Sequence, residues 1–296
     1  MGHNQSWAPE FILVGFPLGA DMEVLLCAVF SLLYVSNLLA NGMILGLIWL
    51  DVRLHTPMYF FLSHLAVIDM SYASSSLPKL LENLMYLYVA FASTECLILV
   101  VMSYDRYVAI CQPLHYTVIM SWRLCTVLAI TSWPCGFSVA LIHLILFLRL
   151  PFCGSQEVNH FFCELIALLK VACGDTWINK VCILSSGAFV LVGPLSLMLF
   201  SYVRILLAIL RIKSKEGRSK AFSTCSSHLC VVGLYFGIAM VMYLVPDNGH
   251  WDEQKKVLSL FYTLFNPLLN PLVYSLRNAQ VKAAFSRAVQ KQRNYK

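Results

Sequence analysis

Apolar stretches long enough to cross a membrane recur along this chain, and they limit what it can fold into. A helix needs about 20 apolar residues to cross the hydrocarbon core of a bilayer. Seven such stretches lie at residues 24–50, 58–80, 86–110, 124–148, 181–210, 222–245 and 257–276. The runs are continuous rather than alternating, which argues against a β-barrel. The sequence therefore predicts an all-α membrane protein, a single seven-helix bundle over residues 1–296.

The composition of the whole chain agrees with burial in lipid. It is 59% hydrophobic and 12% charged, with a mean hydropathy of +0.72, unlike a soluble domain. The length of 296 residues would allow two soluble domains, but no linker separates two cores. No P-loop, His-Glu-x-x-His zinc motif or nucleophile elbow predicts catalysis. We therefore expect neither an enzyme nor a required cofactor.

The basic residues predict the orientation of the bundle. Seven helices put the two termini on opposite sides, and most of the 21 lysines and arginines gather on the side of the C-terminus. Residues 1–23 contain no lysine or arginine, so we expect them outside and the C-terminus in the cytoplasm. No basic segment followed by an early apolar stretch marks a cleaved signal peptide. The net charge of +6 suits anionic lipid and an acidic-faced protein partner better than nucleic acid.

Each end of the chain carries a further signal. Asn4-Gln5-Ser6 is an N-x-Ser sequon, and an outside N-terminus predicts that Asn4 is glycosylated. Residues 278–292 place apolar side chains on one stripe with lysines and arginines around it. This pattern predicts an amphipathic helix lying under the membrane rather than a solvated tail.

A charged pair, Asp105-Arg106, ends the third apolar stretch. Ionised groups beside a lipid-facing helix are costly, so they mark a function or a water boundary. An arginine can donate five hydrogen bonds, and a neighbouring aspartate can hold it until a partner competes for it. Taken alone, the pair could equally be an anchor where the helix leaves the bilayer. The residues around it, from Met102 to Tyr116, favour a functional interpretation.

Four strings together resemble the odorant receptors, a family of rhodopsin-like G-protein-coupled receptors. They lie at 54–63, with His-Thr-Pro-Met-Tyr; at 102–116, with Asp-Arg-Tyr-Val-Ala-Ile-Cys; at 220–228, Lys-Ala-Phe-Ser-Thr-Cys-Ser-Ser-His; and at 266–274, Asn-Pro-Leu-Leu-Asn-Pro-Leu-Val-Tyr. Their order matches the family over nearly the whole chain. The resemblance implies a plasma-membrane receptor that binds a small, mostly apolar odorant within the bundle. It also implies activation of a heterotrimeric G protein of the stimulatory olfactory type, which raises cAMP.

The resemblance also assigns residues to coupling with the G protein. Arg106 is expected to leave Asp105 on activation and to reach towards Tyr202 and Tyr274. The coupling residues implied are Asp105, Arg106, Tyr107, Tyr202, Lys220 and Tyr274.

Two acids, Asp69 and Glu95, fall at membrane depth, where an unpaired charge is expensive. One interpretation is that each is protonated and hydrogen-bonded. The other, which the family resemblance favours, is that they share a sodium ion, flanked by Asn41 and Asn270. We therefore expect a bound sodium ion at these four residues.

The ligand pocket implied by alignment with the family has few polar groups. Its residues are Tyr88, Ala92, Ser93, Ser186, Val190, Phe236, Met240, Tyr243 and Thr263. Each could instead serve helix–helix packing, where small and aromatic residues are common. No acid stands at Tyr88 to pair an ammonium group, so an uncharged volatile molecule fits better than a biogenic amine.

The cysteines sort by compartment. Cys153, Cys163 and Cys173 fall in the long connection between the fourth and fifth helices, which is expected to face an oxidising space. The resemblance implies a Cys153–Cys173 disulfide, with Cys163 bridging to the top of the third helix. A Cys/His metal site with His160 is the weaker alternative. The other eight cysteines lie in or beside helices, where they usually act as small apolar residues.

The chain departs from the family between its second and third helices. Residues 78–86 lead directly into the next helix, so only a handful of residues remain for the turn, and no cysteine precedes Cys96 on the third helix. We therefore expect a third helix shortened at its outer end, starting near residue 86, and a Cys163 without its usual partner. A folding-defective or non-signalling receptor variant is the main alternative. A transporter is less favoured, because we find no internal repeat.

Overall fold

The computed structural model describes residues 12–13, 20–75, 81–151, 157–158, 165–244, 252–276 and 279–293. Side chains at some helical positions, including Lys220, Tyr243 and Tyr274, are outside this description. Residues 1–11, and with them Asn4, also lie outside it.

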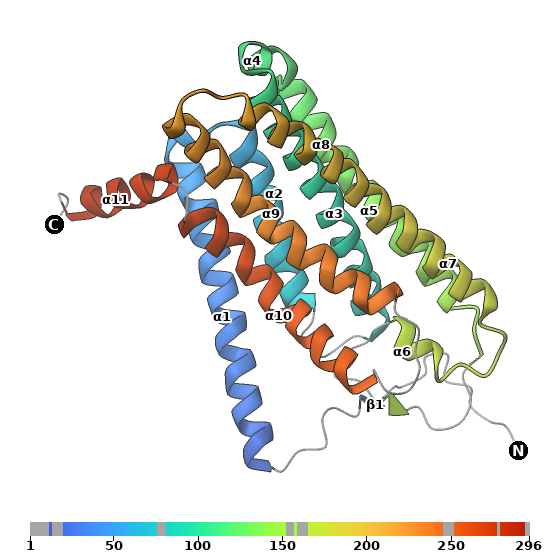
Figure 1. Cartoon of the computed structure of the whole chain (residues 1–296). Coiled ribbons are helices and arrows are strands. Elements are labelled where there is room, and N and C mark those ends of the chain that lie inside the picture. Colours follow the sequence, from blue (N-terminus) through green and yellow to red (C-terminus); the bar gives the residue numbers. More distant parts are fainter. Residues whose placement is uncertain are drawn as a thin grey trace, which may run out of the picture.

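Long helices packed side by side form the body of the described structure (Figure 1). They are α1 (Ala20–Leu50), α2 (Pro57–Ser75), α3 (Leu81–Cys111), α5 (Trp122–Phe147), α7 (Trp177–Gly187) continued through a π-helical turn (Ala188–Val192) into α8 (Gly193–Leu210), α9 (Lys215–Leu244) and α10 (Asp252–Leu276). With α7 and α8 taken as one continuous rod, these make the seven-helix bundle that the sequence predicts.

The α3 helix lies at the centre of the bundle and packs against α2, α5 and α8. Two thirds of its apolar span is buried, against 11% of the span in α1. Among the described residues, four helical segments are long and apolar enough to cross a membrane: Val24–Leu50, Tyr86–Cys111, Trp122–Phe147 and Trp177–Leu210. Their outer faces expose large apolar side chains such as Leu32, Phe189 and Phe200. Apolar surface on this scale is expected of a protein surrounded by lipid.

Prolines and one hydroxyl group shape the helix ends. Ser121 caps the start of α5, where its side chain accepts a hydrogen bond from the Leu124 N–H at 3.4 Å. Pro57 is the first residue of α2, a position that tolerates its missing N–H. Pro194 follows the π-helical turn, and because it cannot donate to a carbonyl one turn back, the ladder rearranges there.

Several helices begin earlier than hydropathy predicts. The α3 helix begins at Leu81 rather than near residue 86, α9 at Lys215 rather than 222, and α10 at Asp252 rather than 257. Hydropathy marks only the apolar part of a helix. Lysine, glutamate and arginine are good helix formers, so a helix continues through them beyond the apolar run. The third helix is thus longer at its outer end than predicted, and residues 76–80 separate it from α2.

Shorter elements lie at the two ends of the bundle (Figure 1). At one end, here called the α4 end, are η1 (Val52–Leu54), η2 (Pro113–His115), α4 (Tyr116–Ile119) and α11 (Ala279–Arg293). At the other, called the β1 end, β1 (Ile12–Leu13) pairs in parallel with β2 (Glu157–Val158), near α6 (Leu165–Leu169). These two ends give a reference for placing the functional residues.

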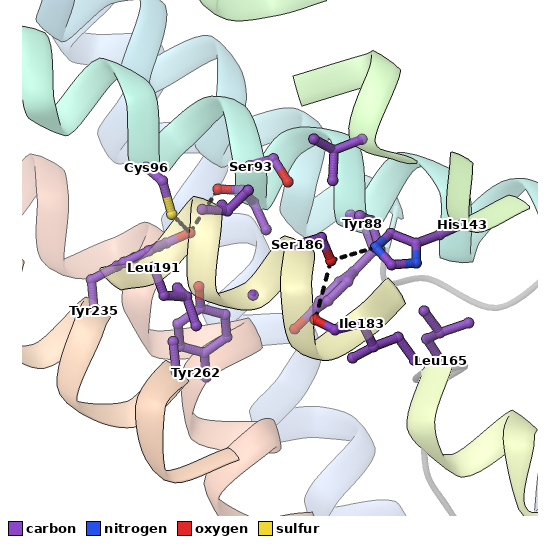
Figure 2. A pocket seen from close by; sticks show the side chains of 16 residues that line it. Tyr88, Ser93, Cys96, His143, Leu165, Ile183, Ser186, Leu191, Tyr235 and Tyr262 are labelled. Carbon is purple, nitrogen blue, oxygen red and sulfur yellow. Dashed lines mark hydrogen bonds between the residues drawn. The ribbon is translucent and has the colours of Figure 1, made fainter. Parts of the chain in front are cut away.

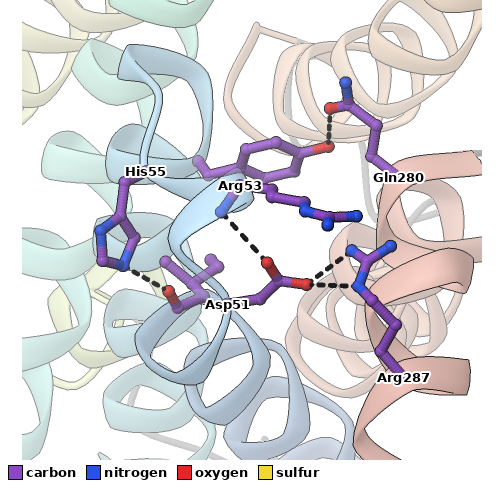
Figure 3. Close-up of polar contacts among 7 residues, drawn as sticks. Asp51, Arg53, His55, Gln280 and Arg287 are labelled. Atoms are coloured by element: carbon purple, nitrogen blue, oxygen red, sulfur yellow. Dashed lines mark hydrogen bonds and ion pairs between the residues drawn. The ribbon is translucent and has the colours of Figure 1, made fainter.

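The α11 helix is held against the bundle by both apolar and polar contacts. Val281 and Ala284 are buried in the core, whereas Phe285 and Val289 are exposed. Arg287 donates to Asp51 Oδ2 from Nε at 3.0 Å and from Nη2 at 2.5 Å (Figure 3). This hydrogen-bonded ion pair lowers the pKa of Asp51 below its ordinary value.

Candidate ligand cavity and coupling site

A cavity opens among the helices on the β1 side of the bundle's middle (Figure 2). It holds about 630 Å³ of space free of atoms, part of it open to the outside. Sixteen residues line it: Tyr88, Val89, Ala92, Ser93, Cys96, Val139, His143, Leu165, Ile183, Ser186, Gly187, Val190, Leu191, Tyr235, Ala239 and Tyr262. They come from α3, α5, α6, α7, the π-helical turn, α9 and α10.

The lining is apolar with a few polar groups. No lysine, arginine, aspartate or glutamate is among these residues, so a charged ligand would find no counter-ion there. The hydroxyl, imidazole and thiol groups can each make hydrogen bonds with a neutral molecule. This composition suits a small uncharged ligand.

Five of the residues that the sequence predicts for the pocket line the cavity: Tyr88, Ala92, Ser93, Ser186 and Val190. Phe236, Met240 and Thr263 are not among the residues that line this cavity. The side chain of Tyr243 is outside the described structure.

On α9 and α10 the lining residue is in each case one position before the predicted residue. Tyr235 and Ala239 face the cavity in place of Phe236 and Met240, and Tyr262 does so in place of Thr263. One residue turns a helix by about 100°, which is enough to move a side chain from the cavity to the packing between helices. Thr263 instead donates to the Ser259 carbonyl at 2.8 Å.

Tyr235 closes one end of the cavity (Figure 2). Its hydroxyl donates to the Ala92 carbonyl at 2.8 Å and accepts from the Cys96 thiol at 3.4 Å. The Tyr235 and Tyr262 rings lie 5.3 Å apart. Sequence reasoning missed Tyr235 as a pocket residue because α9 from Leu229 onwards is apolar on all sides, and no polar stripe marks its inward face.

His143 stands at the opposite end and was also missed. Its Nε2 lies 2.8 Å from Ser186 Oγ, and its side chain is buried (Figure 2). The signal was present in the sequence, as a histidine inside an apolar helix, where an ionisable group points to function.

Two acids from neighbouring helices meet beneath the cavity. Asn270 of α10 donates from Nδ2 to both oxygens of Asp69, at 3.1 and 2.9 Å, and to Glu95 Oε1 at 3.2 Å. Asn266 donates to Glu95 Oε1 at 3.1 Å. All four side chains are buried. The structure thus brings together Asp69, Glu95 and Asn270, as the sequence predicts, and adds Asn266.

Asn41, predicted beside these acids, belongs to a different contact. Its Nδ2 donates to Asn37 Oδ1 and to the Pro267 carbonyl, both at 3.1 Å. Pro271 has no N–H to donate to that carbonyl four residues earlier, and Asn41 supplies the donor instead. The Asn41 amide therefore contacts α1 and α10 rather than the acid pair.

The acid pair has the chemistry of a hard-cation site. Two buried carboxylates this close together cannot both stay charged unless a cation lies between them. Without a cation, at least one of them must hold a proton. Asn270 Oδ1 is buried and has no hydrogen-bond partner among the described residues, and amide oxygens are ligands that hard cations accept. The described residues contain no cluster of three or more histidine, cysteine, aspartate or glutamate side chains, so any such site rests on these two carboxylates and the amides.

The charged pair at the α4 end does not form the contact that the sequence predicts. Asp105 Oδ1 accepts a hydrogen bond from the Tyr116 hydroxyl at 2.7 Å, and Asp105 is 2% exposed. The Arg106 guanidinium makes no hydrogen bond or ion pair with any residue that the structure describes. Adjacent helical residues point about 100° apart, so Tyr116 of α4 reaches the carboxylate more readily. Burial and the Asp105 carboxylate raise the pKa of Tyr116, which therefore remains a donor.

Next to Arg106 in the fold, Tyr202 of α8 binds His228 of α9, Oη to Nδ1. Tyr107 packs between the main core and a small cluster that contains Tyr202. His228 ends the string at 220–228 but was given no role from the sequence. Lys220 and Tyr274 have side chains outside the described structure.

The described cysteines are of two kinds. Cys173 is disulfide-bonded. The others that the structure describes are free: Cys27, Cys96, Cys111, Cys125, Cys135, Cys182, Cys225 and Cys230. Cys153, Cys163 and His160 lie outside the described residues, so the Cys153–Cys173 pairing stays a prediction.

A seven-helix membrane bundle with a central cavity and a buried acid pair agrees with what the resemblance to the G-protein-coupled receptors implies. Residues 30–292 match the model of a family described as olfactory receptor. Human olfactory receptor 2A5 is 64% identical over 310 residues, which covers 99% of this chain and all of the relative. Human olfactory receptor 2A2 is 61% identical, with 99% and 97% covered, and mouse olfactory receptor 2A7 is 57% identical, with 99% of each covered. The chain belongs to the olfactory receptor family.

The alignment with human olfactory receptor 2A5 is longer than this chain, at 310 against 296 residues. The relative therefore has residues that have no counterpart here. The connection between α2 and α3, residues 76–80, is where the sequence predicts the missing segment.

Proposed function

We propose that this chain binds a small uncharged odorant in the cavity between Tyr235 and His143 and activates a stimulatory, cAMP-raising G protein at its α4 end. Membership of the olfactory receptor family makes it a multi-pass membrane receptor for odorants that acts through a G protein. The family is one of receptors, not of enzymes. The ligand class and the type of G protein are the finer parts of the proposal.

The observation that carries the proposal is the position of the cavity above the acid pair. Cys96 lines the cavity and directly follows Glu95 on α3. Glu95 is in turn joined to the other acid, Asp69, through the side chain of Asn270. A ligand that presses on Tyr235 or Cys96 therefore acts on helices that meet at Asp69 and Glu95. It shifts the receptor between states only by binding one state more tightly than the other.

The proposal includes an orientation, with the β1 end outside the cell and the α4 end in the cytoplasm. The concentration of lysine and arginine in the connections at the α4 end supports it. Exposed basic residues there, including Arg211, Lys213 and Arg218, suit the acidic inner leaflet and an acidic-faced partner.

The proposal also includes a sodium ion at Asp69 and Glu95, with the amide of Asn270 beside them. The buried Asn270 Oδ1 without a partner supports this, because turning the amide would direct that oxygen towards the carboxylates. A bound cation would supply positive charge between two carboxylates. Asn266 and Asn270 orient the carboxylates by donating hydrogen bonds to them.

The test is an odorant screen with a cAMP reporter in cells that co-express the olfactory G protein. The receptor carries an N-terminal tag, which is labelled on intact cells. Surface labelling together with odorant-dependent cAMP supports the function, the orientation and the G-protein type together.

A folding-defective receptor is the second candidate, and the short α2–α3 connection favours it. A tagged chain that stays in the endoplasmic reticulum would support that candidate and contradict the main proposal. Human olfactory receptor 2A5, expressed in parallel, gives the comparison for delivery to the surface.

A further inference from the structure

The hydrogen bond between His143 of α5 and Ser186 of α7 is a polar contact inside an otherwise apolar part of the bundle (Figure 2). Neighbouring side chains on both helices turn outwards: Ile142 and Leu184 are 52% and 61% exposed. His143, at 5%, faces inwards with Ser186. The two polar side chains therefore face the cavity rather than the lipid.

The His143–Ser186 pair can make further hydrogen bonds. Ser186 also lies 3.1 Å from the Ile183 carbonyl and donates to it, so His143 Nε2 carries the hydrogen that Ser186 Oγ accepts. In this tautomer His143 Nδ1 is an acceptor, and it makes no hydrogen bond within the described part of the chain. When the serine hydroxyl rotates away from Ile183, the same pair offers a donor.

The surroundings restrict which molecule can use this capacity. Val139, Leu165 and Ile183 line the same end of the cavity and offer only carbon atoms or helix backbone. No charged residue lies in the lining, so a carboxylate or an ammonium group would stay uncompensated. A hydrocarbon would leave His143 Nδ1 without a partner once water is displaced.

We propose that the His143–Ser186 pair binds the oxygen of a neutral alcohol, aldehyde or ketone and so determines which odorants the receptor accepts. The hydrocarbon part of the ligand extends along α3, past Val89 and Ala92, towards Tyr235. From Tyr88 to Cys96 the lining follows α3 for about 12 Å, long enough for a medium-length chain. This inference rests on the proposed function and adds to it a ligand class and two residues that select it.

The experiment compares compounds of equal chain length in the cAMP reporter assay: octanol, octanal, octane, octanoic acid and octylamine, and the same set for shorter and branched skeletons. The receptors are wild type, His143→Phe, Ser186→Ala, His143→Gln and the double variant. We expect wild type to respond to the alcohols or carbonyl compounds. His143→Phe and Ser186→Ala should raise the half-maximal concentration of these about tenfold, the effect of losing one good hydrogen bond.

Three comparisons make the result specific. Val139→Ala, one turn before His143 on the same helix face, should weaken all responses alike without favouring any functional group. His143→Gln keeps a donor and an acceptor and should recover part of the loss. The double variant should lose little more than the worse single variant, because both remove the same contact.

Surface labelling of each variant separates a lost contact from a lost fold, and thermal stabilisation of purified receptor by octanol measures binding without signalling. Equal responses of wild type and His143→Phe to the oxygen compounds, or a wild type that prefers hydrocarbons, acids or amines, would overturn the inference and leave the proposed function standing. A wild type that reaches the surface and neither binds nor responds to any compound would overturn both.

Discussion

Tyr202 of α8 and His228 of α9 share a hydrogen bond of 2.5 Å, from Oη to Nδ1, and their rings stack with centroids 5.6 Å apart. Both side chains are buried at the α4 end of the bundle. The contact joins α8 and α9 at the end where, on the proposed function, the G protein binds. It therefore ties the middle of α9 to α8.

Losing this contact should release α9. We predict that Tyr202→Phe, which keeps the ring and removes only the hydroxyl, raises the basal cAMP signal a few-fold, since a neutral hydrogen bond contributes about 1 kcal/mol. Basal reporter signal, normalised to surface receptor, measures it. Tyr104→Phe is the control, because Tyr104 is an exposed tyrosine on α3. A basal signal in Tyr202→Phe that stays at the Tyr104→Phe level would rule out a tether at this position.

Arg106 is the residue on which coupling should depend most. It stands beside Asp105, which is already engaged by Tyr116, so its guanidinium is available to a partner. Arg106→Ala should abolish odorant-driven cAMP while surface expression stays similar. Arg123→Ala removes an exposed arginine at the start of α5 and should keep its response. A full response from Arg106→Ala would refute the assignment.

The Asp51–Arg287 contact gives a pH prediction with a definite sign. Arg287 lowers the pKa of Asp51 from its ordinary value of 3.8, so the contact stabilises the attachment of α11 above that value and is lost as the pH falls through the lowered pKa. Asp51→Asn should lower the melting temperature of the purified receptor by the same amount at about pH 5 and about pH 8. The Arg287→Gln variant and the Asp51→Asn/Arg287→Gln double variant complete a double-mutant cycle for this contact. A difference between wild type and Asp51→Asn that disappears at about pH 5 would contradict the ion pair.

The sequence predicted a site residue correctly where the partner of that residue could be inferred from the sequence. Asp69 and Glu95 were singled out because acids at membrane depth need a partner, and the family resemblance placed Asn270 beside them. The cavity faces of α9 and α10 were missed by one residue, because Phe236 and Tyr235 are both large and apolar enough to face either way. Tyr116 could not be predicted as the partner of Asp105, since the path of the chain into α4 decides that contact.

The proposed sodium ion makes Glu95 a testable ligand. Glu95→Gln keeps an oxygen that can accept from Asn266 and Asn270 but removes the charge, so the packing should survive and the cation should not bind. Replacing sodium by choline in the medium should change basal activity in wild type and not in Glu95→Gln. Glu216→Gln, an exposed glutamate on α9, is the control and should behave like wild type. Equal sodium dependence in Glu95→Gln and wild type would show that the acids are protonated and structural.

The last prediction follows from the short connection between α2 and α3. No cysteine lies on α3 before Cys96, which is 1% exposed, free and deep in the apolar span Tyr86–Cys111. Cys173 is disulfide-bonded, and the other described cysteines are free, so its partner is either Cys153 or Cys163. We predict a Cys153–Cys173 bridge, which closes a loop of about 20 residues and contributes roughly 3 kcal/mol in the chain-entropy model.

Cys163 should then carry a free thiol, and the loss of the second tether should weaken odorant affinity more than it weakens coupling. Alkylation of the unreduced receptor, followed by mass spectrometry, distinguishes the arrangements. Label on Cys163, with none on Cys153 or Cys173, supports the prediction. Label on Cys153 would mean that Cys163 has taken its place in the bridge, because the α3 helix of this chain offers no other cysteine near the β1 end to pair with it.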